Sequence, residues 1–270
     1  MRIELGDGAV LDTYVAKTSP ELTMPPRPAV LVLPGGGYSY CSAREAEPVA
    51  NLYRAAGCNA FVLYYRCGKD IASCPIKFKA PLIDAARAVD HIRSHAEEYG
   101  INPHQVAVTG FSAGGHLAGW LSANPGDPDL EGLDCRPDAM LLGYPVVSGV
   151  TSPNLGTFRT LLGSDNPPRN ELENFSVEHM ITPDTPPAFI WHTADDGCVP
   201  VQNSLLLAEA LSANGVPFEL HIFPHGPHGL SVATGETSPR GAEMLYDDPY
   251  VARWTQMAVK WLLRTFGRKC

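Results

Sequence analysis

A serine flanked by glycines offers this chain a nucleophile. Residues 106–115 read Val-Ala-Val-Thr-Gly-Phe-Ser-Ala-Gly-Gly, which places Ser112 in a G-x-S-x-G pattern between an apolar run and a stretch of helical period. Where a strand turns abruptly into a helix, flanking glycines avoid collisions, and the strained turn projects the serine Oγ out of the sheet. The pattern therefore predicts that Ser112 attacks a carbonyl carbon and is transiently acylated.

Backbone N–H groups near this serine could stabilise the oxyanion that such an attack creates. The N–H of Ala113 lies at the N-terminus of the expected helix, where it can face the reacting carbonyl. Upstream, an apolar run breaks into the sequence Gly-Gly-Gly-Tyr at 35–38, whose backbone can approach a substrate closely. We expect Gly36 and Gly37 to donate hydrogen bonds together with Ala113. A phosphate-binding loop is not indicated, because the Lys-Ser or Lys-Thr of a P-loop and the G-x-G-x-x-G pattern are both missing here.

Candidates for an acid and a base follow in the chain order Ser, Asp, His. Asp195 and Asp196 form a turn after a late apolar run, and His225 and His228 follow the next one. We favour Asp196 as the acid and His228 as the base, with Asp195 and His225 as the alternatives. The carboxylate would hold the imidazole through Nδ1, while Nε2 takes the proton of the serine and later returns it to the leaving alcohol.

The other histidines are interpreted as structural. His116 follows the nucleophile on the same expected helix and should pack beneath the site, and His192 precedes the acid turn and should brace it. His91 and His95 are four residues apart, a spacing that can bind a metal, but neither an H-E-x-x-H pattern nor a third ligand is nearby. We therefore expect no metal site at these histidines.

These residues need a scaffold, and the chain indicates an α/β fold with a mostly parallel sheet covered by helices on both faces. Short β-rich runs predict strands at 29–33, 60–64, 106–109, 139–142, 188–191 and 218–223. Apolar spacing at three and four residues predicts helices at 46–56, 81–98, 114–123, 204–214 and 249–266. Residues 1–17 should add an antiparallel hairpin at one edge.

The bulk properties narrow the class of protein. A chain of 270 residues with 44% apolar content predicts one domain over 1–270. A net charge of −9 without basic runs argues against nucleic acids and anionic membranes as partners. Seven cysteines without a C-x-x-C pair favour reduced thiols over disulfides or zinc. The first residues match neither a secretory signal nor a membrane-spanning helix, so we expect a cytoplasmic protein. A homo-oligomer is compatible with the sequence, which leaves the oligomeric state open.

Taken in order, the segments 34–38, 110–117, 192–200 and 223–230 resemble those of bacterial acetylesterases, and more narrowly the acetyl-xylan-esterase-like group of small α/β hydrolases. The resemblance covers residues 29–263. It implies an α/β-hydrolase fold and a serine esterase that removes O-acetyl groups from xylo-oligosaccharides or other small acetylated alcohols, without a cofactor. Shorter matches to the group, with no evident chemistry, lie at 43–48, 185–187 and 201–204.

The substrate-binding parts are harder to place. Residues 145–187 and 230–248 are long irregular stretches and thus candidate cap or substrate loops. The first is too short and too rich in Pro and Asn for a large helical lid, which disfavours long-chain lipids. Tyr38, beside the glycine run, is our candidate substrate-binding side chain, although its ring could equally pack on the loop. Tyr144 is a further candidate for setting specificity.

Three other functions fit the sequence less well. An exopeptidase or amidase would use the same three residues, but no charged groups that could hold a peptide terminus stand out near the motifs. A hydrolase fold that only binds ligands would show damage to the nucleophile turn or the glycine loop, and the sequence shows none. A lipase would need an amphipathic apolar lid, which the sequence does not supply.

Overall fold

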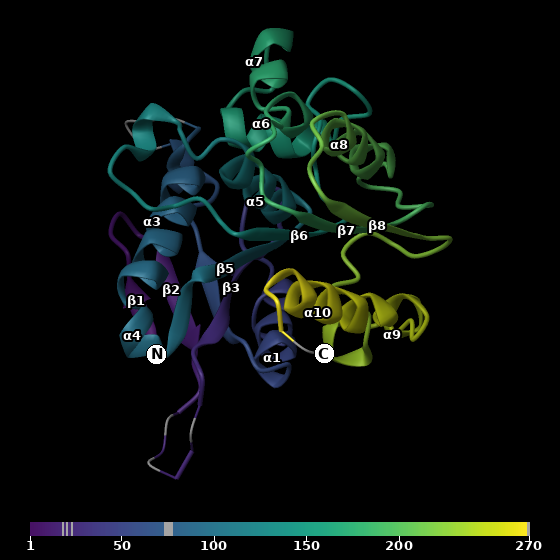
Figure 1. Cartoon of the computed structure of the whole chain (residues 1–270). Coiled ribbons are helices and arrows are strands. Elements are labelled where there is room, and N and C mark those ends of the chain that lie inside the picture. The colour runs from purple at the N-terminus through teal and green to yellow at the C-terminus, as the bar shows by residue number, and fades with distance from the viewer. Residues whose placement is uncertain (18, 20, 23, 73–77, 269–270) are drawn as a thin grey trace.

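An eight-stranded sheet organises the described residues, which are 1–17, 19, 21–22, 24–72 and 78–268 of the computed structural model (Figure 1). Its strands are β1 (Arg2–Glu4), β2 (Val10–Tyr14), β3 (Arg27–Leu33), β4 (Asn59–Tyr64), β5 (Ile101–Phe111), β6 (Ala139–Gly143), β7 (Ala188–Thr193) and β8 (Phe218–Phe223). They lie side by side in the order β1-β2-β4-β3-β5-β6-β7-β8.

The pairing of the strands confirms the predicted sheet. The strands from β3 to β8 are parallel to one another, while β1 and β2 form an antiparallel hairpin that pairs with β4 at one edge of the sheet, as predicted. The largest difference is β5, which begins at Ile101 rather than at residue 106. The register with β3 shifts in this stretch, since Ile101 pairs with Arg27 but Val106 pairs with Ala29. A proline and polar residues at 102–105 hide this irregular start from a search for apolar runs.

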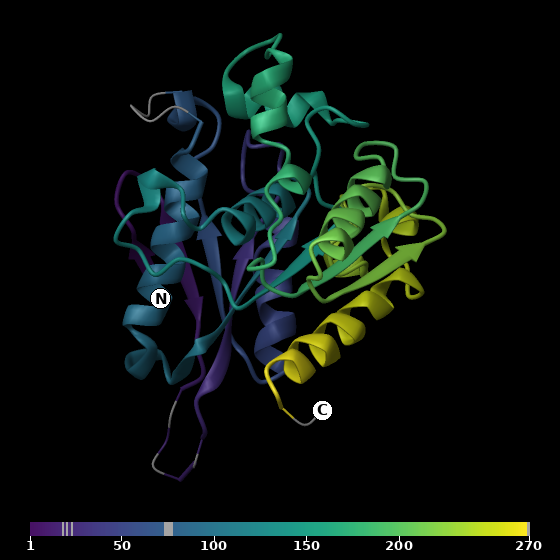
Figure 2. The same cartoon turned by 45° about the horizontal axis from the view of Figure 1, so that its top comes forward.

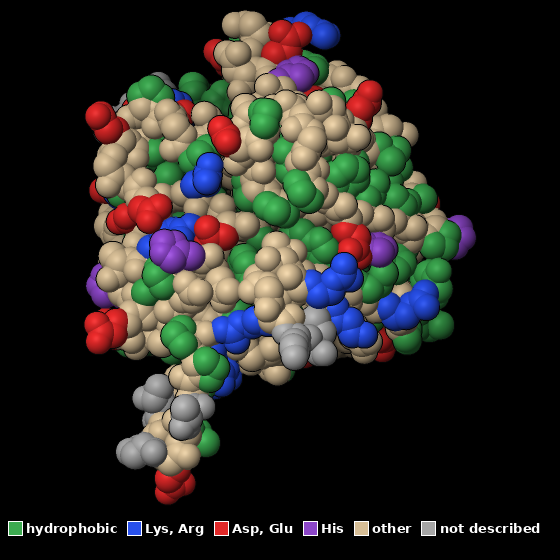
Figure 3. All heavy atoms as spheres, viewed as in Figure 1, with side chains coloured by type: hydrophobic (Ala, Val, Ile, Leu, Met, Phe, Trp, Pro, Cys, Tyr) green, Lys and Arg blue, Asp and Glu red, His purple; other side chains and the backbone are tan. Residues whose placement is uncertain are grey.

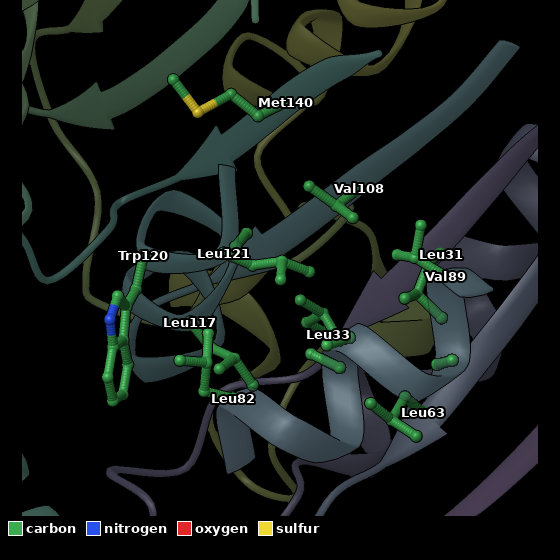
Figure 4. Packing of buried hydrophobic residues seen from close by; sticks show 14 of the residues in the cluster. Leu31, Leu33, Leu63, Leu82, Val89, Val108, Leu117, Trp120, Leu121 and Met140 are labelled. Atoms are coloured by element: carbon green, nitrogen blue, oxygen red, sulfur yellow. The ribbon is translucent and has the colours of Figure 1, made fainter. Parts of the chain in front are cut away.

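Five longer helices cover the two faces of the sheet (Figures 1 and 2). One face carries α3 (Ala80–Ser94), α5 (Ala113–Ala123) and α8 (Gln202–Ala213), and the other carries α1 (Glu47–Ala55) and α10 (Trp254–Thr265). Alternation along β3 feeds both cores, because Leu31 and Leu33 pack toward α3 and α5 while Val30 and Val32 pack toward α1 and α10. Figure 4 shows part of the first of these cores, including Leu31 and Leu33 of β3 together with Leu82 and Val89 of α3.

The last helix also reaches the loop after β8. The indole of Trp254 stacks on Trp191 of β7, with ring centroids 4.8 Å apart and planes inclined by 16°. Its Nε1 donates a hydrogen bond of 2.9 Å to the carbonyl of Ser231. The helix predicted at 249–266 starts later than expected, at Trp254, after a 3₁₀ turn at Val251–Arg253. This first residue of α10 supports the loop after β8, at the carboxyl ends of the strands.

Several short helices were not predicted, namely α2 (Lys69–Ala72), α6 (Leu155–Leu162), α7 (Arg169–Asn174) and α9 (Glu243–Tyr246). The helix predicted at 81–98 is divided, because α3 ends at Ser94 and a separate short helix, α4 (Ala96–Tyr99), follows it. The expectation that 145–187 is irregular is therefore wrong in part, because α6 and α7 lie within it and stand above the sheet in Figure 1. The side chain of Asn154 caps α6 by accepting from the N–H of Thr157, and Phe158 and Leu162 bury one face of this short helix.

The structure also bears on the predictions about surface charge, membrane-spanning helices and cysteines. The face seen in Figure 3 carries both acidic and basic side chains, with several Lys and Arg side chains near its lower edge. Within the described part of the chain, no helix combines the length and the apolar character needed to cross a bilayer. Cys41, Cys58, Cys67, Cys135 and Cys198 are free thiols. Cys74 and Cys270 lie outside the described residues.

Candidate active site

The nucleophile turn has the strained geometry that its sequence predicts. Ser112 joins β5 to α5 with φ 53° and ψ −120°, a conformation that L-residues rarely adopt. A Cβ on Gly110 would lie 2.1 Å from the carbonyl oxygen of Gly114, and a Cβ on Gly114 would lie 2.0 Å from that of Leu33. Both positions flanking the serine therefore require glycine for steric reasons.

The structure brings together the three residues favoured as nucleophile, base and acid. Nε2 of His228 lies 2.9 Å from Oγ of Ser112, and Nδ1 of the same ring lies 2.7 Å from Oδ2 of Asp196. The other carboxylate oxygen of Asp196 accepts hydrogen bonds from the N–H groups of Cys198 and Val199, at 2.8 and 2.9 Å. In this hydrogen-bonded triad, a proton can pass from the serine to the imidazole while the carboxylate keeps the ring in place.

The alternative acid and base form a separate pair away from the nucleophile. Nδ1 of His225 lies 3.0 Å from Asp195, which also accepts from the N–H of Gly226 at 2.8 Å. The side chains of His225 and Asp195 are 84% and 53% exposed, whereas that of Asp196 is fully buried. This geometry separates the pairs that the sequence alone could not.

Burial and hydrogen bonding act in opposite directions on Asp196. Burial raises the pKa of this carboxyl group, but hydrogen bonds from His192 and His228 outweigh burial and bring the pKa well below its usual range. His192 is itself fully buried, with Nδ1 2.8 Å from Oγ of Ser204 and Nε2 3.4 Å from Asp196. Asp196 is therefore a carboxylate at neutral pH, as an acceptor for the Nδ1–H of His228 must be.

The three candidate oxyanion donors flank the serine. Gly36 and Gly37 line the same pocket as Ser112, and their N–H groups make no hydrogen bond to the described residues. Ala113 is the first residue of α5, so its N–H group has no acceptor within the helix. Such unpaired N–H groups beside a nucleophile suit a developing negative charge on oxygen.

The position of Tyr38 does not fit the substrate-binding role predicted for it. Its ring is fully buried and does not line the pocket, and its hydroxyl is 2.8 Å from Nδ1 of His116. The opposite nitrogen of His116 lies 2.8 Å from the carbonyl of Phe175. Of the two interpretations of Tyr38, the structure thus favours a ring packed beneath the glycine loop, because the nucleophile helix supplies it with a buried hydrogen-bond partner.

His116 should make folding sensitive to acid. Burial lowers its pKa to about 4, so the folded protein keeps the ring neutral while the unfolded chain takes up a proton below about pH 6.5. The free energy of unfolding should fall as the pH drops from 6.5 toward 4, by up to about 3 kcal/mol from this residue. Urea unfolding at pH 7 and 4.5 should show a smaller loss in His116→Gln, which keeps polar groups but does not titrate. An equal loss in both proteins would assign the effect to other groups.

The pocket in front of the serine has a volume of about 450 Å³, and its wall combines polar with apolar surface, the polar part being the larger. Besides Ser112, His228 and the glycine loop, it is lined by Ser39, Tyr40, Ser42, Arg44, Glu45, Asn154, Gly156, Thr157, Thr160, Cys198 and Gly229. The candidate cap 145–187 thus contributes through the start of α6, whereas no residue of 230–248 lines this pocket. Within the described residues, no cluster of three or more His, Cys, Asp or Glu side chains could hold a metal ion.

Sequence reasoning missed most of this wall. Arg44 and Glu45 fall in the matched segment 43–48, which showed no evident chemistry. Asn154 carried a readable signal, since an Asn before an apolar repeat is typical of a helix N-cap. Nothing in the local pattern indicated that Thr157 and Thr160 would face the pocket.

Comparisons with known proteins agree with this geometry. The BD-FAE family model matches residues 11–136, and that of the Prolyl oligopeptidase family matches residues 153–266. Endo-1,4-beta-xylanase B of Butyrivibrio fibrisolvens is 42% identical over 215 residues, and an acetylxylan esterase of Xylanibacter ruminicola is 29% identical over 211. These alignments cover 78% and 76% of this chain but only 33% and 42% of the two relatives, so the chain spans less than half of their length.

Two solved structures match over nearly their full length. An acetyl ester-xyloside bifunctional hydrolase from Caldicellulosiruptor lactoaceticus has a TM-score of 0.81 at 40% identity, covering 96% of this chain and 88% of that one. A sugar hydrolase from Lactococcus lactis also has a TM-score of 0.81, at 34% identity, covering 99% and 98% of the respective chains. With this likeness and the serine turn described above, the chain belongs to the α/β-hydrolase superfamily, alongside bacterial esterases of the acetylxylan esterase type.

Proposed function

We propose that the protein is a serine esterase that removes O-acetyl groups from xylo-oligosaccharides or other small acetylated alcohols. The observation that carries the proposal is the hydrogen-bonded row of Ser112, His228 and Asp196, which opens into a polar pocket beside unpaired N–H groups. The names of similar proteins support the substrate class, since they include an acetylxylan esterase and an acetyl ester-xyloside hydrolase.

In the proposed reaction, His228 takes the proton from Ser112 through Nε2 as Oγ attacks the acetyl carbonyl carbon. The carbonyl oxygen becomes an oxyanion that accepts hydrogen bonds from Gly36, Gly37 and Ala113. Collapse of this intermediate breaks the ester bond, and the imidazolium returns its proton to the departing alcohol. Water, activated by the same imidazole, then attacks the acetyl-serine and releases acetate. Asp196 stabilises the imidazolium throughout.

The character of the pocket supports a small acyl group on a polyhydroxylated alcohol. Hydroxyl and amide side chains at Ser39, Ser42, Asn154, Thr157 and Thr160 line it, and such groups can pair with sugar hydroxyls. A long acyl chain would gain little in this pocket, because its binding depends on continuous apolar contact. This reasoning favours acetylated sugars over lipids.

A substrate panel tests the proposal. Purified protein would be assayed with p-nitrophenyl esters from acetyl to octanoyl, with acetylated xylo-oligosaccharides by acetate release, and with aminoacyl p-nitroanilides. We expect kcat/KM to fall at least about tenfold from acetyl to octanoyl, with acetate released from the oligosaccharides and no anilide cleavage. A preference for octanoate, or faster cleavage of the anilides than of the acetate ester, would contradict the proposed substrate class.

A further inference from the structure

A short turn links the two loops on either side of the nucleophile. We call residues 35–42 the oxyanion loop and residues 224–233 the base loop. The 3₁₀ turn Ala43–Glu45 directly follows the first, and its side chains contact both. This turn belongs to the matched segment 43–48, and the proposed reaction gives its residues no role.

Glu45 uses its two carboxylate oxygens for different parts of the site. Oε2 accepts a hydrogen bond of 2.8 Å from the N–H of Gly35, at the start of the oxyanion loop. Oε1 accepts a hydrogen bond of 2.6 Å from the hydroxyl of Tyr144. Glu45 is only 4% exposed, so both bonds are shielded from water. A buried carboxylate is costly unless it is well hydrogen-bonded, and here both of its oxygens are paired.

Tyr144 carries this connection to the base. Its hydroxyl oxygen accepts from the N–H of Ser231 at 2.9 Å, in the base loop. Its ring meets the His228 imidazole edge-on, with centroids 5.0 Å apart. A continuous chain of buried contacts thus runs from Gly35 through Glu45 and Tyr144 to the base.

Arg44 makes a second connection to the same loop. Its guanidinium donates hydrogen bonds to the carbonyls of Gly229 and Thr237, and its own carbonyl accepts from Oγ of Ser231 at 2.6 Å. The guanidinium also lies over the ring of Tyr246, 4.8 Å from its centroid. The base loop is therefore held just after His228 by contacts from one turn.

The backbone at these contacts needs such restraint. Tyr144, Ser231 and Ala233 have φ values of 35°, 55° and 55°, in the left-handed region that non-glycine residues rarely occupy. Conformations of this kind persist only where surrounding contacts hold them. Two of these three residues bond directly to the turn or to Glu45.

We propose that Glu45 is a positioning residue, which holds the N–H donors of the oxyanion loop in register with His228 through Gly35 and Tyr144, while Arg44 anchors the base loop. This inference rests on the proposed function. It predicts that loss of Glu45 damages transition-state stabilisation rather than substrate binding, because the residue acts through the backbone donors and the base.

Glu45→Ala, Glu45→Gln and Tyr144→Phe test the inference. In Glu45→Gln the amide oxygen can still accept from Gly35. We expect Glu45→Ala to lower kcat for p-nitrophenyl acetate about 100-fold, the effect of losing one oxyanion donor, with KM within about threefold of wild type. Glu45→Gln should recover to within about tenfold of wild type. In the double variant Glu45→Ala/Tyr144→Phe, the fold-loss of kcat should be smaller than the product of the fold-losses in the two single variants, because both substitutions interrupt the same chain of contacts.

Asn59→Ala is the matched control for lost stability. Asn59 is 1% exposed and is hydrogen-bonded to the backbone of Ala16 and Tyr99. It is the first residue of β4 and so lies at the amino ends of the parallel strands, whereas the site lies at their carboxyl ends. Its loss should lower Tm while kcat stays within about twofold. If Glu45→Ala behaves like this control, or if Glu45→Gln is as slow as Glu45→Ala, the positioning role is wrong.

Labelling of the serine separates failure of this inference from failure of the proposed function. A p-nitrophenyl phosphonate reacts with an activated serine whatever ester is the natural substrate, and mass spectrometry identifies the modified residue. If wild type is not labelled at Ser112, the proposed function fails. If wild type is labelled and Glu45→Ala is labelled equally fast, only the positioning role fails.

Discussion

Replacing Ser112 by alanine is expected to lower kcat for p-nitrophenyl acetate by about 10⁶-fold, the scale measured when the nucleophile of a serine hydrolase is removed. The alanine variant has no oxygen 2.9 Å from Nε2 of His228, so no acyl-enzyme can form. Initial rates at saturating substrate, followed by the release of p-nitrophenol, would measure the loss. A residual rate about 10³–10⁴-fold above the uncatalysed reaction can remain, because the N–H donors still bind the carbonyl oxygen.

Ser122→Ala gives a control for this substitution on the same helix. Ser122 lies in α5, is 1% exposed, and its Oγ makes no hydrogen bond to the described residues. Its activity should match that of wild type. If Ser112→Ala keeps more than about one hundredth of the wild-type rate, another residue must be the nucleophile.

Replacing Asp196 by asparagine is expected to lower kcat about 10⁴-fold, because the amide no longer selects the imidazole tautomer that accepts a proton at Nε2. Oδ2 of Asp196 lies 2.7 Å from Nδ1 of His228, and an Asn side chain can offer an NH₂ group to that nitrogen instead. The ring would then carry its proton on Nε2, where it cannot take the proton of Ser112. The measurement is kcat on p-nitrophenyl acetate, with KM and Tm determined in parallel.

Asp195→Asn is the neighbouring control. Asp195 bonds to His225 and Gly226 rather than to His228, so this change should leave kcat within about threefold of wild type. Equal losses in Asp195→Asn and Asp196→Asn would mean that the whole turn, rather than one carboxylate, supports the base. A large loss in Asp195→Asn alone would reverse the assignment of the acid.

The sequence predicts those parts of the structure in which residues close together in the chain fix the local backbone conformation. The turn at Ser112 is one example, because Gly110 and Gly114 are required within the same five residues. The parallel strands are another, since the predicted parts of β3 to β7 are short apolar runs and β8 alternates apolar with polar residues. Local pattern does not distinguish Asp195 from Asp196, because both lie in one turn. The N–H groups of Cys198 and Val199 bind Oδ1 of Asp196 and orient its carboxylate toward the base.

The parts that pattern did not predict depend on contacts between distant segments. Glu45 and Tyr144 are 99 positions apart, and Arg44 and Thr237 are 193 positions apart. The misplaced expectation for Tyr38 has the same origin, because its partner His116 is 78 positions away. No local periodicity carries information about such pairs, since they form only when the sheet brings their loops together.

The indole of Trp254 has a consequence for the order in which the site is completed during synthesis. The chain leaves the ribosome from its N-terminus, so the nucleophile, the acid and the base all emerge before α10 does. Until Trp254 stacks on Trp191 and bonds to Ser231, the base loop lacks one of its anchors. A growing chain therefore carries Ser112, Asp196 and His228 before Trp254 is in place to hold the base loop.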